Sequence, residues 1–158
     1  MKLPLMLATI AIFVAVAADR VGPPGAYPPA FVIGATDPKV TQDNIHQTIC
    51  VAGYTSTVRA VTASTKAAVL QRDGQTVAGC CEVDHFLSLE IGGSNDAHLN
   101  LWAQPYAGEY GARKKDVVET ALHRLVCQGK MTLIDAQHCI TKDWIACGRK
   151  IGVLPKGR

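Results

Sequence analysis

Apolar side chains recur at helical spacing in the last third of the chain. Residues 112–127 carry one stripe of them and residues 132–146 carry another, so the sequence predicts two amphipathic helices. Gly129 ends the first helix, and Thr132 with Asp135 forms a capping-box-like start for the second. The expected buried stripes are Val117, Val118, Ala121, Leu122 and Leu125 in the first helix, and Leu133, Ala136, Ile140 and Trp144 in the second.

Shorter patterns occupy the middle of the chain. Two Thr- and Val-containing pieces, residues 48–52 and 57–61, favour strands. Residues 62–72 hold good helix formers behind a Ser or Thr cap. Residues 82–102 contain two apolar runs separated by a turn-forming Gly-Gly pair, which indicates two strands joined by a loop. Short strands mixed with helices in one chain are typical of an α+β fold.

The composition divides the 158 residues into a single domain with extensions at both ends. Residues 18–39 are rich in Pro, Gly and Ala, so we expect an extended linker or an arm that wraps the domain. Residues 40–147 are expected to form the domain itself. Residues 148–158 are expected to form a short, mobile basic tail.

Residues 1–17 have the layout of a secretory signal peptide. Lys2 supplies the positive start, an apolar run follows, and Ala15-Val16-Ala17 is a small-residue cleavage site. An uncleaved anchor is the alternative, but the apolar run is shorter than the roughly 20 residues that a membrane span needs. We therefore expect a secreted or periplasmic protein that has no membrane attachment after cleavage.

The chain contains six cysteines, and an even number of cysteines in an exported chain suggests disulfide bridges. Cys139 and Cys147 are a sequence-local pair. A bridge between the neighbours Cys80 and Cys81 would be strained. A structural zinc module that uses Cys80 and Cys81 is a weaker alternative, because the sequence has no Cys-x-x-Cys pair. The spacing alone leaves the pairing open.

Charge is unevenly distributed, although the net charge is only +3. Residues 82–109 contain five acids and no Lys or Arg, whereas residues 110–158 contain ten Lys or Arg and four acids. An acidic pocket beside a basic flank suits a metal ion together with a polyanion. Solvated helix faces are the alternative explanation.

Asp84 and His85 stand together where the first apolar run of residues 82–102 ends. Hydrolysis of a phosphodiester needs an activated water, stabilisation of charge on the phosphate and help for the leaving oxygen. A histidine can supply the first, and a hard divalent cation held by carboxylates can supply the other two. Neighbours on a strand point to opposite faces, so one site can use both residues only where the strand ends or twists.

Residues 82–102 resemble the core of HNH nucleases, a ββα fold built around one metal ion. The resemblance rests on Asp84-His85, Gly92-Gly93-Ser94-Asn95 and Asn100-Leu101, and a weaker likeness extends from residue 48 to residue 144. It implies that Asp84 is a metal ligand and that His85 is the general base. It also implies that the Asn100 amide bridges the loop backbone and holds the His85 strand, and that Cys50 pairs with Cys127, as in secreted relatives.

The closing metal ligand departs from the commonest HNH pattern, which has a His or Asn on the helix. Position 109, where that residue would fall, is Glu. A secreted branch of the family instead shows a pattern that Gly111, Ala112, Lys115, Asp116 and Glu119 match. Asp116 is therefore the first choice for the closing ligand, with Glu119 and Glu109 behind it, and a solvated helix face is the alternative. Lys115 and Arg113 either contact phosphates or belong to the soluble surface.

The leading hypothesis is a secreted, monomeric endonuclease with a disulfide-stabilised HNH-type core and additional helices. It would cut DNA, with RNA as a further candidate substrate, and a carboxylate site would favour Mg²⁺ or Mn²⁺ over Zn²⁺. The alternative is a catalytically inactive extracellular binding domain on the same scaffold. The missing closing His is the sequence feature that keeps this alternative open.

Overall fold

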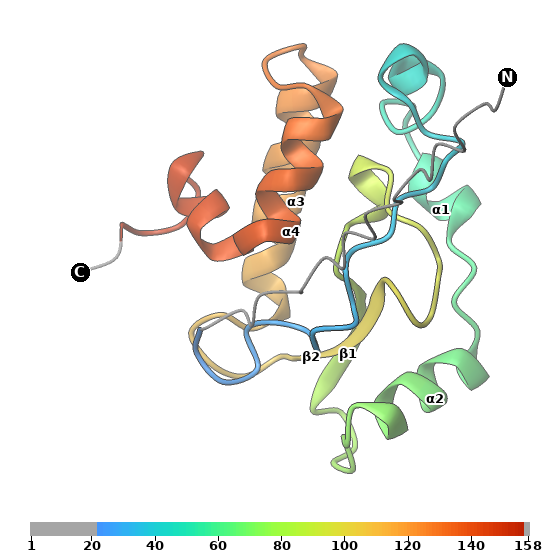
Figure 1. Cartoon of the computed structure of the whole chain (residues 1–158), viewed down its shortest axis with the longest axis vertical. Coiled ribbons are helices and arrows are strands. Elements are labelled where there is room, and N and C mark those ends of the chain that lie inside the picture. The colour runs from blue at the N-terminus through green and yellow to red at the C-terminus, as the bar shows by residue number, and fades with distance from the viewer. Residues whose placement is uncertain (1–21, 157–158) are drawn as a thin grey trace, which may run out of the picture.

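A computed structural model describes residues 22–156, so the proposed signal peptide lies outside the described residues. The described part is an α+β domain with a two-stranded sheet (Figure 1). None of its helices combines the length and the apolar character that a membrane span requires. In chain order the elements are η1 (Gln42–Gln47), α1 (Tyr54–Val58), α2 (Ala63–Arg72), β1 (Cys81–His85), η2 (Leu89–Ile91), β2 (Leu101–Pro105), α3 (Ala112–Cys127) and α4 (Leu133–Lys150).

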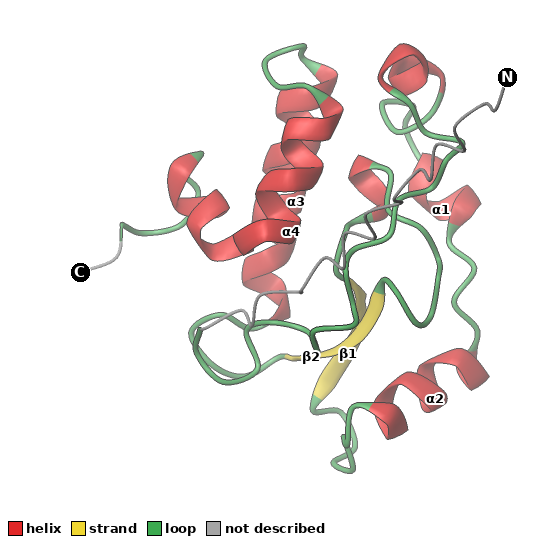
Figure 2. Cartoon of the chain, in the orientation of Figure 1, coloured by secondary structure: helices red, strands yellow, loops and turns green. Residues whose placement is uncertain are grey.

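The sheet consists of β1 and β2, which run antiparallel with Asp84 opposite Trp102 and His85 opposite Leu101. Helix α3 packs against α4 and contacts β1, while α2 contacts both strands away from that helix pair (Figure 2). The two predicted strands and the predicted α3 are therefore present, and β1 ends at His85. The end of the strand thus coincides with the Asp84-His85 pair.

The loop between the strands is held by a buried amide and two glycines. Asn100 is fully buried; its Oδ1 accepts from Leu87 N at 2.8 Å, and its Nδ2 donates to Leu87 O at 2.9 Å and to Ser94 O at 2.7 Å. Gly92 has a φ of 78°, and a Cβ on Gly93 would lie 1.8 Å from Leu87 O. The expected bridging role of Asn100 is confirmed, and the Gly-Gly pair is required by backbone conformation and by close approach.

The N-terminal arm crosses the domain and packs into its core. Ala26 and Val32 are buried, and Ala26 O accepts a hydrogen bond of 2.7 Å from Trp144 Nε1. The Tyr27 hydroxyl donates to Asp143 Oδ1 at 2.6 Å, where α4 is interrupted by a non-helical residue. The described part of the predicted arm therefore stabilises α4, and Trp144 is a core residue as expected.

The outer edge of β2 is covered by residues at the end of α2. Asp73 Oδ2 accepts from Ala103 N at 2.8 Å, and Arg72 Nη2 donates to Leu101 O at 2.7 Å. The Arg72 guanidinium also donates to both carboxylate oxygens of Asp73. Thr62 caps the start of this helix, because its hydroxyl accepts from Thr65 N. Helix α2 is thereby fastened along the sheet.

Two parts of the chain differ from the sequence-based expectation. Residues 48–52 and 57–61 are not strands, because this region forms η1, turns and α1. The turns bond locally, for example from Cys50 N to Ile45 O at 2.9 Å, so the backbone needs no strand partner. The basic tail is also shorter than expected, since α4 continues to Lys150 and Leu154 is buried in the core.

All six cysteines lie in the described part and form three bridges, Cys50–Cys127, Cys80–Cys81 and Cys139–Cys147. Cys50–Cys127 joins the segment after η1 to the end of α3. Three bridges are compatible with an oxidising, extracellular compartment. With its sulfurs bonded to each other, the Cys80–Cys81 pair does not offer the thiolates of a structural zinc module.

Candidate active site

The face of α3 that packs inward changes from charged to apolar along the helix. Lys115 and Glu119 are buried one turn apart, and Val118, Leu122 and Val126 continue the same face. Val117, which was expected in the buried stripe, is 48% exposed. The expectation was wrong because it assigned only apolar residues to the core, whereas two paired charges occupy the first half of the inward face.

The Lys115 ammonium is the centre of this charged half. It donates to Asp84 Oδ2 at 2.6 Å, to the backbone oxygen of His85 at 2.8 Å and to Glu119 Oε1. Three acceptors use all three N–H bonds of the ammonium. The contact ties α3 to the end of β1, and it brings the helix carboxylates to the Asp84-His85 pair.

Burial and charge act against each other in this cluster. Burial disfavours the charge on Lys115, but the carboxylates of Asp84 and Glu119 raise its pKa above the ordinary value. Burial raises the pKa of the Glu119 carboxyl, the Lys115 ammonium lowers it, and Asp84 raises it again. A single buried cation is therefore shared between two carboxyl groups.

Two further carboxyl groups adjoin the cluster. Burial raises the pKa of Glu82, and the charges on Asp84 and Asp116 add to this effect. Burial also raises the pKa of Asp116, with Asp84 as the next cause. Glu82 lies on the same face of β1 as Asp84, because they are two residues apart on the strand. Four acids thus surround Lys115, and their mutual repulsion favours an additional cation.

His85 lies on the other face of β1 from Asp84, because adjacent strand residues alternate. Its ring is 2% exposed, and its Nε2 lies 3.1 Å from Asn95 Oδ1. That oxygen also accepts from Ala60 N at 3.2 Å, while Asn95 Nδ2 donates to Val58 O at 2.8 Å. The orientation of the amide makes His85 Nε2 the hydrogen-bond donor, so the lone pair of the neutral ring is on Nδ1.

The environment of His85 favours the neutral ring. Burial lowers its pKa below the ordinary value of 6.5; the hydrogen bond that the ring donates to Asn95 and the charge of Asp84 raise it, and Arg59 and Lys115 lower it. A neutral histidine at physiological pH can accept a proton. The buried ring therefore has the charge state of a general base, although its exposure is small.

Polar groups opposite the acids on the sheet remain without partners. Trp102 and Gln104 face Asp84 and Glu82 across the strands and are buried. Trp102 Nε1 and both polar atoms of the Gln104 amide have no hydrogen-bond partner among the described residues. Cross-strand partners share a face of the sheet, so donors and an acceptor lie on the Asp84 side. This composition fits a polar ligand or an ion beside the carboxylates.

The structure brings together only part of the predicted site. The side chains of Asp84, Lys115 and Glu119 meet, but His85 joins them only through its backbone oxygen, since its ring lies on the other face of β1. Asp116 is exposed and lies close enough to interact electrostatically with Asp84. Neither alternative for Lys115, a phosphate contact or a place on the soluble surface, fits the structure, because its ammonium is buried and enclosed by acceptors. Arg113 is exposed beside Asp116, Glu109 is exposed on the loop before α3, and Asn100 is structural.

Three residues near the site were not among the predicted site residues. Asn95 belongs to the Gly92-Gly93-Ser94-Asn95 motif but was given no role at the site, and it orients His85. Arg59 interacts electrostatically with Glu82 and His85 although it is far away in the sequence. Strand alternation places Glu82 beside Asp84, and this signal was available in the sequence.

The site combines a buried ammonium, four carboxyl groups and an oriented neutral histidine at the junction of β1 and α3. Carboxylate oxygens are the kind of ligand that a hard cation prefers, and a neutral histidine can accept one proton, although the described acids do not form a group of three whose ligand atoms lie within 4.8 Å of one another. Comparison with known proteins finds no matching family model, no matching curated protein and no matching solved structure. The chemistry of the site therefore rests on its geometry alone.

Proposed function

We propose that this protein is a secreted, metal-dependent endonuclease that hydrolyses phosphodiester bonds of DNA, and of RNA as a further substrate, through an HNH-type centre. The observation that carries the proposal is the contact of the Lys115 ammonium with both Asp84 and the His85 backbone. It brings the α3 carboxyl groups of Asp116 and Glu119 to an Asp-His pair at the end of a strand, and this supports the ββα core that the sequence resembles.

The donor set is suitable for Mg²⁺ or Mn²⁺, which prefer carboxylate oxygens. Lys115 binds only Oδ2 of Asp84, so Oδ1 is the oxygen that would face the ion. Asp116 would be the second ligand, because Glu119 is engaged by Lys115 whereas Asp116 is exposed beside Asp84. When bound, such an ion stabilises charge on the phosphate and on the leaving oxygen.

Each of the other side chains has a role of its own in the proposal. His85 takes a proton from water at Nδ1, while Asn95 holds the other ring nitrogen. Lys115 is a positioning residue that holds the Asp84 carboxylate and the end of β1 in place. Arg59 and Arg113, both exposed next to the acids, are the candidates for contact with the substrate phosphates.

The test is nicking of a supercoiled plasmid by the protein with Mg²⁺, and with EDTA in its place. We expect cleavage that EDTA abolishes and that added Mg²⁺ restores. His85→Ala should reduce the rate by about 10²–10⁴-fold. Glu109→Gln is the matched control and should cleave at the wild-type rate, because Glu109 is exposed and is not among the charges that shift the pKa values of His85 and Asp116. EDTA-resistant cleavage, or full activity of a folded His85→Ala variant, would contradict the proposal.

A second candidate is a non-catalytic binding domain on the same scaffold. Two observations favour it: His85 is 2% exposed, and Lys115 already neutralises part of the acidic cluster. The two candidates differ in a gel-shift measurement combined with the nicking assay. Binding of DNA in Mg²⁺ without any cleavage would support the binding domain.

A further inference from the structure

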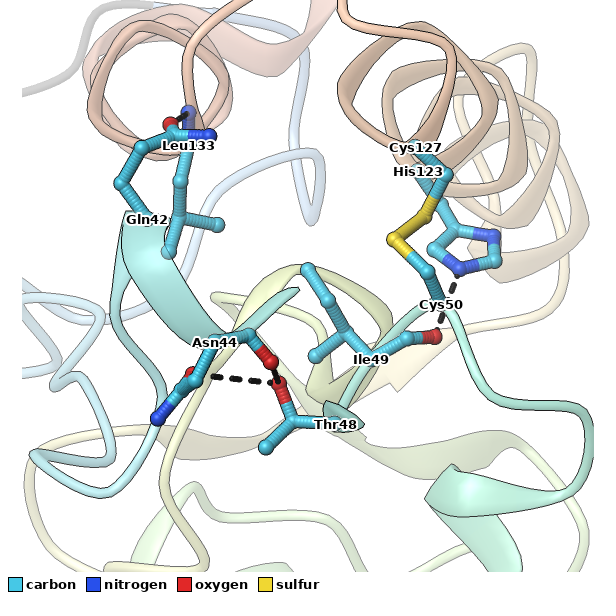
Figure 3. Close-up of a disulfide and its surroundings, with 8 residues drawn as sticks. All are labelled: Gln42, Asn44, Thr48, Ile49, Cys50, His123, Cys127 and Leu133. Carbon is cyan, nitrogen blue, oxygen red and sulfur yellow. Dashed lines mark hydrogen bonds between the residues drawn. A yellow bond between two sulfur atoms is a disulfide. The ribbon is translucent and has the colours of Figure 1, made fainter. Parts of the chain in front are cut away.

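A hollow of about 330 Å³ lies between the segment after η1, η2 and α3. Cys50, His123 and Glu90 contribute to its lining, together with residues 51–53. Figure 3 shows His123 next to the Cys50–Cys127 bridge, one helical turn before Cys127. A histidine and two sulfurs thus meet at the end of α3, away from the Asp84–Lys115 cluster.

The three side chains have the composition of a zinc site. The two sulfurs and a ring nitrogen of His123 all lie within 4.8 Å of one another. Tetrahedral Zn²⁺, with bonds of about 2.3 Å to sulfur and about 2.0 Å to nitrogen, requires ligand atoms roughly 3.5–3.8 Å apart. The His123 ring is thus near the sulfurs, and Nδ1 would be the ligand because Nε2 donates to Ile49. Side-chain rotation would have to bring Nδ1 and the two sulfurs to these separations once the bridge is broken.

His123 is also held as metal-bound histidines are. Its Nε2 lies 2.8 Å from the carbonyl oxygen of Ile49, and since a carbonyl only accepts, Nε2 is the donor (Figure 3). A ring N–H donated to a backbone carbonyl is the usual outer contact of a histidine ligand, because it sets the ring orientation and the tautomer. The contact does not involve the sulfurs, and it anchors His123 beside Cys50.

We propose that the reduced protein binds one Zn²⁺ ion through Cys50, Cys127 and His123, and that this ion and the Cys50–Cys127 disulfide exclude each other. A dithiol reductant breaks the bridge: its own disulfide forms, and two electrons and two protons pass to the cysteine sulfurs. The ion then displaces both thiol protons, because thiolates are the ligands. The segment after η1 is thus linked to the end of α3 either by the Cys50–Cys127 disulfide or by the Zn²⁺ ion.

Glu90 lies in the same hollow, and its carboxylate is the candidate for the fourth zinc ligand. Its Oε2 is buried and has no hydrogen-bond partner among the described residues. It lies outside the group of three, but it lines the hollow with Cys50 and His123. A carboxylate is an acceptable zinc ligand, and a water is the alternative fourth ligand. The site would prefer Zn²⁺, whereas the carboxylate cluster would prefer Mg²⁺ or Mn²⁺.

The experiment titrates the protein with Co²⁺, a spectroscopic substitute for Zn²⁺, before and after reduction by a phosphine. The phosphine becomes its oxide, and water supplies the two protons. We expect a thiolate-to-cobalt absorption band only in the reduced protein, with one ion per chain, and loss of the band when Zn²⁺ is added. His123→Ala should weaken binding at least about tenfold, since even an outer partner of a ligand contributes about 10–100-fold.

Matched cysteine variants identify which sulfurs bind the metal ion. Replacing Cys50 and Cys127 together by Ser should abolish the band, whereas the same change at Cys139 and Cys147, or at Cys80 and Cys81, should retain it. A band that persists unchanged in both His123→Ala and the Cys50/Cys127 variant overturns the proposal. Absence of any band in reduced wild type also overturns it.

If reduction unfolds the chain, far-UV circular dichroism measures whether the metal ion restores the fold. The proposal then requires Zn²⁺ to restore the helical signal of wild type and not of His123→Ala, because metal binding supplies folding free energy. Zinc binding without recovery of the native signal counts against the proposal. Nicking activity in Mg²⁺ is an independent readout, so failure of the nuclease proposal and failure of the zinc proposal are distinguishable.

Discussion

Lys115→Met tests the charged centre, because methionine keeps most of the volume and removes the cation. The variant leaves two carboxyl groups without the partner that wild type provides at 2.6 Å from Asp84 and in contact with Glu119. Removing one member of a buried ion pair costs about 3–5 kcal/mol of the free energy of unfolding. We expect a loss of this size at about pH 8, where ionised carboxylates dominate in the unfolded chain.

The free energy of unfolding that Lys115→Met removes should be smaller at about pH 5 than at about pH 8. Burial holds the pKa of Glu119 above its ordinary 4.5, so the folded state binds this proton more tightly than the unfolded state. Such a group contributes stability that is present at low pH and is lost as the pH rises toward the folded-state value. Without Lys115 this shift grows, and each additional pKa unit is worth about 1.4 kcal/mol. The destabilisation should therefore decrease by at least that amount between the two pH values.

Urea unfolding followed by tryptophan fluorescence measures both losses. Lys114→Met is the control on the same helix, because Lys114 is exposed, and it should change stability by less than about 0.5 kcal/mol. A Lys115→Met protein that loses less than about 1 kcal/mol at about pH 8 would refute the assignment of a buried ion pair. Equal losses at the two pH values would refute the role of Glu119.

Three other outcomes are expected. If His85 is the base, the acidic limb of the rate profile in the nicking assay should fall below the ordinary pKa of 6.5, because burial lowers its pKa; a limb above that value would exclude it. Asn100→Ala should cost about 3 kcal/mol in urea unfolding, since the buried N–H and C=O of Leu87 lose their partners. Loss of the Cys50–Cys127 bridge, which spans 77 residues, should lower the free energy of unfolding by about 4.5 kcal/mol. Loss of the Cys139–Cys147 bridge, which spans 8 residues, should lower it by about 2.5 kcal/mol, and equal losses would contradict this loop-length argument.

Regular elements with strong local patterns could be predicted from the sequence. The bounds of α3 were expected correctly, and the two strands surround a Gly-Gly turn as the pattern indicated. The region around α1 was predicted wrongly, because Thr and Val favour strands only when a partner strand is available. Gly53, with a φ of 81°, starts a helical turn there instead.

The site was predictable where the residues are neighbours in sequence and not where they meet through folding. Asp84 and His85 are adjacent, so a single pattern identified them both. The position of Lys115 depends on which face of α3 packs inward, and the apolar pattern hid this because two charges neutralise each other there. The contact between His85 and Asn95 depends on the loop path, and the nearness of Arg59 depends on α1.

The fastening of α2 along β2 has a consequence for behaviour in concentrated solution. A two-stranded sheet has an unprotected outer edge on each strand, and such edges recruit strands from other molecules. Here Asp73 accepts the outward N–H of Ala103, and Arg72 donates to the outward carbonyl of Leu101. On the β2 edge, these two backbone groups are therefore already occupied by side chains. Helix α2 and Asp73 after it, which hold none of the proposed catalytic groups, thus protect this edge of the sheet against pairing with another molecule.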